Sequence, residues 1–385
     1  MDNTSLSDQL LSTVAGNTQF ALNLYAQLRV NPGNLFFSPY SISTALAMTY
    51  AGVREETEAQ MAQVLHFTEQ AKTHRVFAQL RARMEEIDRA DVNNLRIANR
   101  LWPHQRYPFL QPFLDICREE YAAPPVPVDY NEPDAARQII NDWVAQETED
   151  KIRELITPGI LNALTRLVLV NAIYFKGNWA SQFDKAKTET APFWIGPSES
   201  IDAPLMQQQA TFPYGETANV QIVELPFVGD DLALVVLLPR ERDGLRKIEE
   251  SLSAPDLHSW LRRLRPREVD LCLPRFRVNS SFRLDSTLRA LGMADAFDDA
   301  KADFSGMDGE KWLYIAAVLH QAYMEANEEG AEAAAATAVV MKLRSLPPPP
   351  AIVRADHPFL FLLREKQTGS LLFMGRVVNP VAQSD

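Results

Sequence analysis

The stretch that decides the fold spans residues 328–350 and reads EEGAEAAAATAVVMKLRSLPPPP. Its front is acidic and contains Gly330, its middle is small and apolar, and its end is four prolines. Prolines favour an extended backbone and cannot continue a helix or a central strand. The segment is therefore typical of an exposed loop that presents Lys342 to Ser345 to a partner.

Two local structures compete for the middle of this stretch. Alanine is the best helix former, which favours a short surface helix. At period two, however, the odd positions from Ala331 to Met341 form an uncharged face, while Glu332 and Lys342 share the opposite face. A strand with one buried face has this pattern, whereas at helical spacing the apolar residues wrap all round. The pattern permits insertion into a sheet without burial of a charge, and it leaves the helix open.

Four blocks of the sequence resemble the serpin family of serine protease inhibitors. The run EEGAEAAAAT is similar to the hinge of an inhibitory serpin's reactive-centre loop. The C-terminal signature of the family resembles VRADHPFLFLL at 353–363 and FMGRVVNP at 373–380. Two further family blocks resemble NLFFSPYSI at 34–42 and VNAIYFKGNW at 170–179. The blocks occur in the family's order, so the resemblance covers nearly the whole chain.

The resemblance implies a single α+β domain over residues 1–385, with three β-sheets, about nine helices and an exposed reactive-centre loop. It also implies a suicide-substrate inhibitor rather than an enzyme. A serine protease attacks the loop, and the cleaved loop then inserts as a new antiparallel strand into a five-stranded main sheet. The acylated protease is carried along and distorted before water releases it. Strand addition and stored strain are the physical principles behind this mechanism.

Family spacing places the reactive bond fourteen residues after the hinge glycine, at Arg344-Ser345. An arginine fits the acidic primary pocket of trypsin-like proteases, so the expected partner is such a protease in a covalent complex. Lys342-Leu343, two residues earlier, is the alternative bond. The segment from Ser345 to Pro358 is a few residues longer than in common serpins, and its four prolines stiffen it, which leaves the fit to a target open.

The hinge implied by the resemblance comprises Glu328, Glu329, Gly330, Ala331, Glu332, Ala333, Ala334, Ala335, Ala336 and Thr337. Its inward positions are small, as insertion requires. Non-inhibitory serpins, which act as carriers, chaperones or storage proteins, tend to have bulky or charged residues there. The hinge therefore favours an inhibitor, with the non-inhibitory class as the alternative.

Two residues mark the breach, the place where the loop would enter the sheet. By resemblance, Arg275 lies on the strand beside this place and pairs with Glu328, and Trp179 lies next to it. Without the resemblance, Arg275 is typical of a surface charge and Trp179 of a core residue.

A second group, the shutter, would lie under the centre of the main sheet where the strands must part. By resemblance it contains Ser38, Ser41, Asn171 and His320. From the residues alone, Ser38 precedes a proline and is a candidate helix N-cap, with Ser41 in the same first turn. A lone histidine on an apolar strand is most often a hydrogen-bonded core group.

The densest basic stretch, which we call the basic cluster, consists of Arg262, Arg263, Arg265 and Arg267. A solvated helix end explains it, and an exosite for an acidic protease surface or for a polyanion such as heparin is the alternative. Residues 69–87 predict another helix with several basic residues, but acidic residues follow its arginines, which favours a solvated face of mixed charge.

Composition excludes several functions. The net charge of −12 argues against nucleic-acid binding. No apolar run approaches the length of a membrane span, and residues 1–25 lack the pattern of a signal peptide. The two cysteines indicate buried, reduced thiols rather than a disulfide framework. Common enzyme, metal and cofactor motifs are absent. We therefore expect a cytoplasmic monomer without cofactor or metal, and export by another route stays open.

Overall fold

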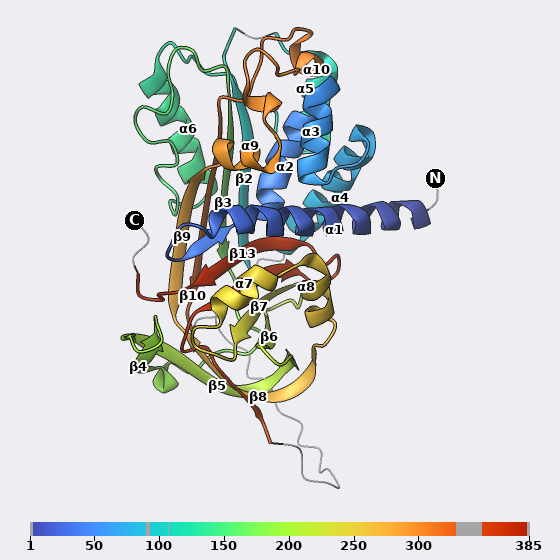
Figure 1. Ribbon diagram of the computed structural model, residues 1–385. Coiled ribbons are helices and arrows are strands. Elements are labelled where there is room, and N and C mark those ends of the chain that lie inside the picture. The colour runs from blue at the N-terminus through green and yellow to red at the C-terminus, as the bar shows by residue number, and fades with distance from the viewer. Residues whose placement is uncertain (1–2, 90–92, 107, 329–348, 383–385) are drawn as a thin grey trace.

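The computed structural model describes residues 3–89, 93–106, 108–328 and 349–382. Ten α-helices and thirteen β-strands lie within these residues, in an α+β arrangement, where the sequence predicted about nine helices. One long sheet runs through the upper part of the molecule, with helices packed around it, and most other strands gather at the lower end (Figure 1).

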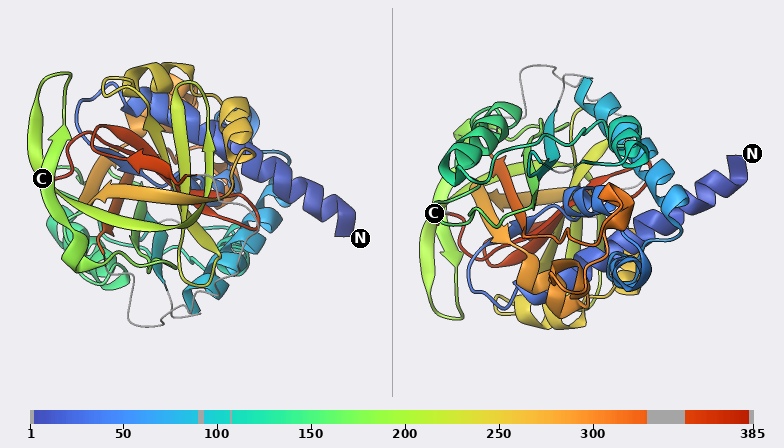
Figure 2. Two further views of the ribbon diagram at one scale, coloured as in Figure 1. Left: turned by 90° about the horizontal axis from the view of Figure 1, so that it is seen from below. Right: turned by 90° about the horizontal axis from the view of Figure 1, so that it is seen from above.

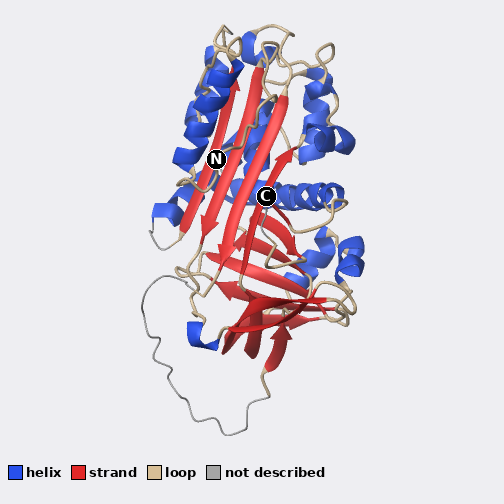
Figure 3. Cartoon of the chain, turned by 90° about the vertical axis from the view of Figure 1, so that its left-hand side faces the viewer, coloured by secondary structure: helices blue, strands red, loops and turns tan. Residues whose placement is uncertain are grey.

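The main sheet contains β2 (Asn94–Pro103), β3 (Leu167–Lys176), β10 (Ala317–Ala326) and β9 (Phe276–Arg283), in that order. Figure 3 shows these long strands side by side. The central strands β3 and β10 are parallel and pair directly, whereas β2 and β9 pair antiparallel with their neighbours. We call the direct pairing of β3 with β10 the seam.

The described residues supply four strands to the main sheet instead of the expected five. Residues 123–128, which read APPVPV, run beside the outer edge of β2. Val126 and Val128 donate backbone hydrogen bonds to Leu101 and Pro103 at 3.1 and 2.9 Å. Three of the six residues are prolines, which have no N–H to donate, so the ladder remains incomplete. This segment occupies the place of a fifth strand without forming one.

The other nine strands form one hydrogen-bonded path, β1-β13-β12-β7-β6-β5-β8-β11, with β4 paired to β5. Only three residue pairs, from Tyr214↔Val223 to Glu216↔Gln221, join β5 to β6. When the path is divided into two sheets at this narrow junction, the described residues form the three expected sheets. Their bounds are β1 Leu35–Phe37, β4 Glu189–Trp194, β5 Ser200–Glu216, β6 Val220–Pro226, β7 Leu232–Pro239, β8 Arg265–Pro274, β11 Ala351–Arg354, β12 Phe359–Glu365 and β13 Leu371–Val377.

Helices cover the sheets on several sides, and α1 extends beyond the rest of the fold toward the N-terminus (Figure 2). The α-helices are α1 Asn3–Leu28, α2 Pro39–Tyr50, α3 Glu55–Leu65, α4 Gln70–Arg89, α5 Gln111–Glu119, α6 Pro133–Glu147, α7 Leu245–Ser251, α8 Ala254–Leu261, α9 Asp285–Leu291 and α10 Ser305–Asp308. Every residue of α2 is buried, and this helix contacts β3, β2 and β13. It therefore lies beneath the seam.

Both cysteines are free and buried. Burial raises the pKa of the Cys117 thiol to about 12 and that of Cys272 to about 11, so both thiols stay protonated near neutral pH. No helix among the described residues is long and apolar enough to cross a membrane.

Candidate functional site at the seam between β3 and β10

The two faces of β10 pack against different cores. Ala322, Met324 and Ala326 belong to the core shared with the nine-stranded path, whereas Leu319 and Tyr323 pack with the cluster that contains residues of α6. This alternation is the period of two expected of a strand buried on both faces. We call the face that carries Ala322, Met324 and Ala326 the inner face of the seam, and the face that carries Leu319 and Tyr323 the outer face.

The breach is held closed by a buried carboxylate at the end of β10. Arg275 Nη2 lies 2.5 Å from Glu328 Oε1, and the Thr188 hydroxyl donates to the same oxygen. The Glu328 side chain is 2% exposed. Burial acts to raise the pKa of Glu328, but the hydrogen bonds from Arg275 and Thr188 outweigh it, so the pKa lies below its ordinary value. The chain is thus fixed by charge where it leaves the sheet.

Trp179 secures the adjacent residue. Its indole Nε1 donates to the Asn327 carbonyl at 2.8 Å, and its ring stacks on Phe227 with centroids 4.6 Å apart. A Cβ added at Gly177 would come within 2.4 Å of atoms of both Phe175 and Phe227, so this turn has no room for a side chain. The inner wall of the breach is therefore aromatic and tightly packed.

The shutter residues meet in one row across the main sheet. Asn171 pairs in register with Asn99 of β2 on one side and with His320 of β10 on the other. His320 Nε2 accepts the Ser38 N–H at 3.0 Å, so the ring proton lies on Nδ1 and is donated to Asn171 Oδ1. Burial lowers the pKa of His320 to about 3, which keeps the ring neutral.

The remaining shutter bonds tie this row to α2 and β13. The Asn171 amide donates to Ser41 Oγ and to Asn99 Oδ1. Ser38 Oγ donates to the Leu372 carbonyl at 2.6 Å and accepts the Ser41 N–H at 3.1 Å, which makes Ser38 the N-cap of α2. The structure thus brings together all four predicted shutter residues, and Ser38 caps a helix while it links strands.

Asn99 is part of this network, although the sequence did not single it out. Its side chain contacts Ser41 and Asn171. Within residues 95–102, which read LRIANRLW, the only signal was one uncharged amide among apolar and basic residues. The place of Asn99 in the network depends on the register between β2 and β3, and the sequence of β2 alone does not specify that register.

The basic cluster lies where α8 leads into β8. Arg262, Arg263 and Arg265 are exposed. Arg265 Nη1 donates to the backbone carbonyls of Arg262 and Leu264 at 2.9 and 2.7 Å. Arg267 lies 3.9 Å from Glu216 and over the Tyr214 ring. The side chains of Arg265 and Arg267 therefore already have partners within the protein.

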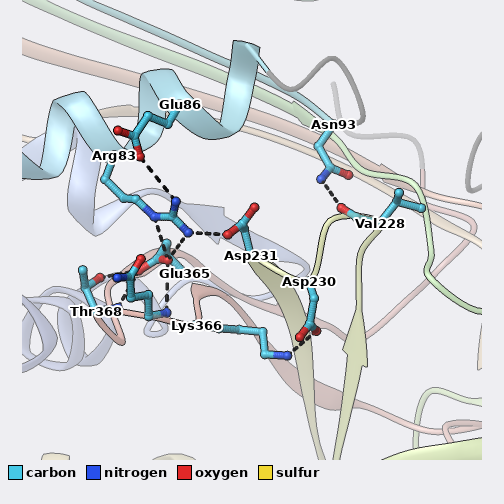
Figure 4. A network of polar contacts seen from close by, with 10 residues as sticks. Arg83, Glu86, Asn93, Val228, Asp230, Asp231, Glu365, Lys366 and Thr368 are labelled. Carbon is cyan, nitrogen blue, oxygen red and sulfur yellow. Dashed lines mark hydrogen bonds and ion pairs between the residues drawn. The ribbon is translucent and has the colours of Figure 1, made fainter.

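The arginines of α4 were predicted to form a solvated face, but Arg83 is a structural residue. It binds Asp231 and, at 3.2 Å, the Glu365 carboxylate, which is fully buried (Figure 4). Thr368 also donates to Glu365, through its backbone N–H and its hydroxyl at 2.6 Å each. The network attaches α4 to two strand connections, the one between β6 and β7 and the one between β12 and β13, so Arg83 is not available to a polyanion.

The reactive bond Arg344-Ser345, the alternative bond Lys342-Leu343 and the hinge residues 329–337 lie outside the described residues. The described chain ends at Glu328 on one side and resumes at Pro349 on the other. Glu328 lies at the breach, and Pro349 leads into β11, which pairs with β8 at the lower end of the molecule in Figure 1.

Comparisons with known proteins agree with this geometry. The family profile described as "Serpin (serine protease inhibitor)" matches residues 15–380. The human leukocyte elastase inhibitor is 41% identical over 377 residues, covering 95% of this chain and 99% of the relative. Uncleaved ovalbumin superposes with a TM-score of 0.87 at 32% identity, covering 96% of this chain and 100% of ovalbumin. Native protease nexin-1 with heparin gives 0.87 at 28% identity, with 96% and 100% covered. The chain therefore belongs to the serpin family of serine protease inhibitors.

Proposed function

We propose that the protein inhibits trypsin-like serine proteases by suicide cleavage at Arg344-Ser345, followed by insertion of the cleaved loop into the seam. The observation that carries the proposal is the direct parallel pairing of β3 with β10. A strand that follows β10 through a tight turn runs antiparallel to both neighbours. A single inserted strand therefore hydrogen-bonds to β10 along one edge and to β3 along the other.

The faces of the seam support this register. A turn over residues 327–330 puts Ala331 opposite Ala326, and directly opposed residues of an antiparallel pair point to the same face. Ala326 packs into the inner core, so the uncharged odd positions from Ala331 face inward. Glu332 and Lys342 then face outward. The sequence pattern of the loop and the packing of β10 lead independently to one arrangement.

The chemical steps are those of an interrupted hydrolysis. The serine Oγ of the protease attacks the carbonyl carbon of Arg344, and the Arg344–Ser345 peptide bond breaks. The new amino group of Ser345 leaves with a proton from the protease's general acid. Arg344 remains bound to the protease as an ester. Insertion then competes with attack by water on that ester.

The driving force for insertion is large. About ten newly paired residues contribute roughly 10 kcal/mol, at about 1 kcal/mol per net hydrogen bond. Burial of the alanine, threonine, valine and methionine side chains adds about 25 cal/mol per Å². The native form is held kinetically, because the bonds of Glu328 and of the shutter must open first.

The specificity rests on the residue before the cleaved bond. A relative at 41% identity is named a leukocyte elastase inhibitor, but this chain has arginine at the family's position. A buried acidic group at the base of a protease pocket selects arginine. Cleavage at Lys342-Leu343 would select the same protease class, and the inserted strand would be two residues shorter. The alternative function, a non-inhibitory serpin, predicts cleavage without a trapped complex.

Incubation of the protein with an equimolar amount of trypsin tests the proposal. A complex that survives a denaturing gel is expected, together with a released peptide that starts at Ser345 in mass spectrometry. Arg344→Ala should abolish the complex, while the matched control Lys342→Ala should retain it. A peptide that starts at Leu343 would move the bond, and cleavage without any stable complex would support the non-inhibitory class.

A further inference from the structure

We propose that the outer edge of β2 is a docking site for an extended segment of a partner protein, in which acidic residues alternate with apolar ones. The site, which we call the edge groove, runs along residues 95–100 of β2 between α4 and α6, and both helices contact this strand (Figure 1). The inference does not depend on the proposed inhibitory function. It adds an interaction surface that contains no residue of the loop or of the breach.

The backbone of β2 has unused hydrogen-bonding groups along this edge. Leu101 directs its carbonyl outward, because it accepts the Val126 N–H at 3.1 Å. Since alternate residues of a strand turn their backbone groups to the same side, Ile97 and Asn99 face outward as well. Neither of these two residues has an outward backbone hydrogen bond within the described parts of the chain. An open edge of this kind can accept a further strand.

The edge is open because the fifth strand of the main sheet begins late. The chain turns at Ala122, whose backbone is left-handed with φ 51°, and runs beside β2 only from residue 123 onward. The residues that would extend this segment backward along β2 form α5 and a turn instead. The first half of β2 therefore faces a hollow of about 360 Å³. This volume lies within the range of ligand-binding clefts.

The outer wall of the edge groove contains three buried donors without an acceptor. The Arg100 guanidinium lies over the Trp143 ring of α6 at 4.2 Å and over the Trp102 ring at 5.6 Å, and we call these residues the arginine–tryptophan cluster. Arg100 Nε and both indole nitrogens have no hydrogen-bond partner among the described residues. Most buried donors in folded proteins have a partner, so the cluster is suited to receive an acceptor such as a carboxylate.

Arg100 is also the cation of the groove that lacks an ion pair. Burial lowers its pKa from the ordinary value, and the charge of Glu147 offsets only part of this effect. The other two arginines that line the groove already have carboxylate partners, which are Glu85 for Arg81 and Asp88 for Arg96. The groove is therefore complementary to one added negative charge, which determines the sign of the ligand.

The inner wall of the edge groove is apolar. Leu95 and Ile97 direct their side chains toward the core shared with the nine-stranded path, whereas Ala98 packs in the outer cluster with α6. Tyr40 and Met84 line the groove and pack in the same core as Leu95. A bound strand would place alternate side chains against this apolar wall and against the arginine–tryptophan cluster. The expected ligand therefore has acidic residues separated by single apolar ones.

Binding of two blocked pentapeptides to the full chain, measured by calorimetry, tests the proposal. Acetyl-Val-Glu-Val-Glu-Val-amide should bind, and the charge-reversed acetyl-Val-Lys-Val-Lys-Val-amide should not. Arg100→Met retains an apolar side chain beside Trp143 but removes the charge, so it should weaken binding of the acidic peptide about tenfold. Arg246→Met, which removes an exposed arginine of α7, is the matched control and should bind like the parent.

A second variant tests the backbone pairing independently of charge. Ile97→Pro removes an N–H that points away from β3, which is where edge strands tolerate proline. It should weaken binding of the acidic peptide while the melting temperature stays near that of the parent. In the parent, the bound peptide should slow hydrogen exchange of the Ile97 and Asn99 amides, and unchanged exchange at both amides would contradict strand addition.

Other results would also overturn the proposal. Equal binding of the two peptides, or no binding of the acidic peptide at about 1 mM, would exclude a site of this chemistry. Binding of glutarate as tight as that of the acidic peptide would reduce the groove to a site for small anions. Self-association of the parent that Arg100→Met abolishes would make a second copy of this chain the occupant.

Discussion

Acidification should weaken the seam through His320. This ring is fully buried, and both of its nitrogens are engaged, Nε2 by the Ser38 N–H and Nδ1 by Asn171. Burial lowers its pKa from 6.5 to about 3. Between these values the unfolded chain takes up a proton that the folded chain does not, so stability that is complete above pH 6.5 is lost as the pH falls. At pH 5 the loss is about 2 kcal/mol.

The same penalty favours any local opening that brings His320 into contact with water. Parting of β3 from β10 is such an opening, so its equilibrium constant should rise about 25-fold between pH 7 and pH 5. Hydrogen exchange of the β3 and β10 amides, corrected for the intrinsic effect of pH on exchange, measures it directly. Spontaneous loss of inhibitory capacity on storage at the two pH values gives a functional counterpart.

His74 provides the control for this prediction. Burial lowers its pKa to about 4, but the ring lies in α4 and contacts the Tyr121 hydroxyl rather than the seam. His74→Gln should reduce the pH dependence of global unfolding and leave that of seam opening unchanged. His320→Gln, which can still donate to Asn171 and accept from Ser38, should flatten the pH dependence of seam opening. A rise of about 25-fold that persists in His320→Gln would refute the reasoning.

Four further results are expected. Arg275→Ala leaves the buried Glu328 carboxylate with the Thr188 hydroxyl as its side-chain partner. The free energy of unfolding, measured by heat or urea, should fall by about 1–2 kcal/mol, a modest loss because the arginine is itself 45% exposed. Arg277→Ala, which loses an exposed ion pair, is the control and should change little. Ala331→Arg would bury a charge against the aromatic wall of the breach at several kcal/mol, so trypsin should cleave it normally with little complex formed, whereas Glu332→Arg should still inhibit. Cleavage of the loop should raise the melting temperature, and equal melting temperatures would contradict insertion. Heparin should leave the rate of inhibition unchanged, and acceleration that disappears when Arg263 is replaced would instead make the basic cluster an exosite.

The site was predictable from sequence where local blocks carry the information. Ser38 and Ser41 lie in one block and Asn171 in another, and the resemblance placed both blocks, with His320, under the centre of the sheet. Asn99 was missed because its contacts arise from pairing between β2 and β3. A strand's own residues do not encode the partner opposite each position, so no local pattern identifies it.

Two further differences have physical causes that lie between elements. The fifth strand of the main sheet is incomplete because residues 124, 125 and 127 are prolines, which an expectation drawn from the family alone overlooks. Arg83 looked like part of a solvated helix because its neighbours in sequence are charged. Its partner Glu365 is 282 residues away in sequence, and only the tertiary fold brings a buried carboxylate to it.

The seam has room for one strand, and this sets how such a protein can be used. Once a strand has been inserted, β3 and β10 have no unpaired edges left to accept a second strand. The cleaved peptide bond of the loop is not re-formed. Under the proposed mechanism each molecule acts once, so inhibitory capacity is a count of molecules rather than a dissociation constant. An added target is removed mole for mole until the supply is exhausted, and dilution afterwards does not return it. Supply of fresh protein, rather than affinity, becomes the quantity that a cell would have to regulate.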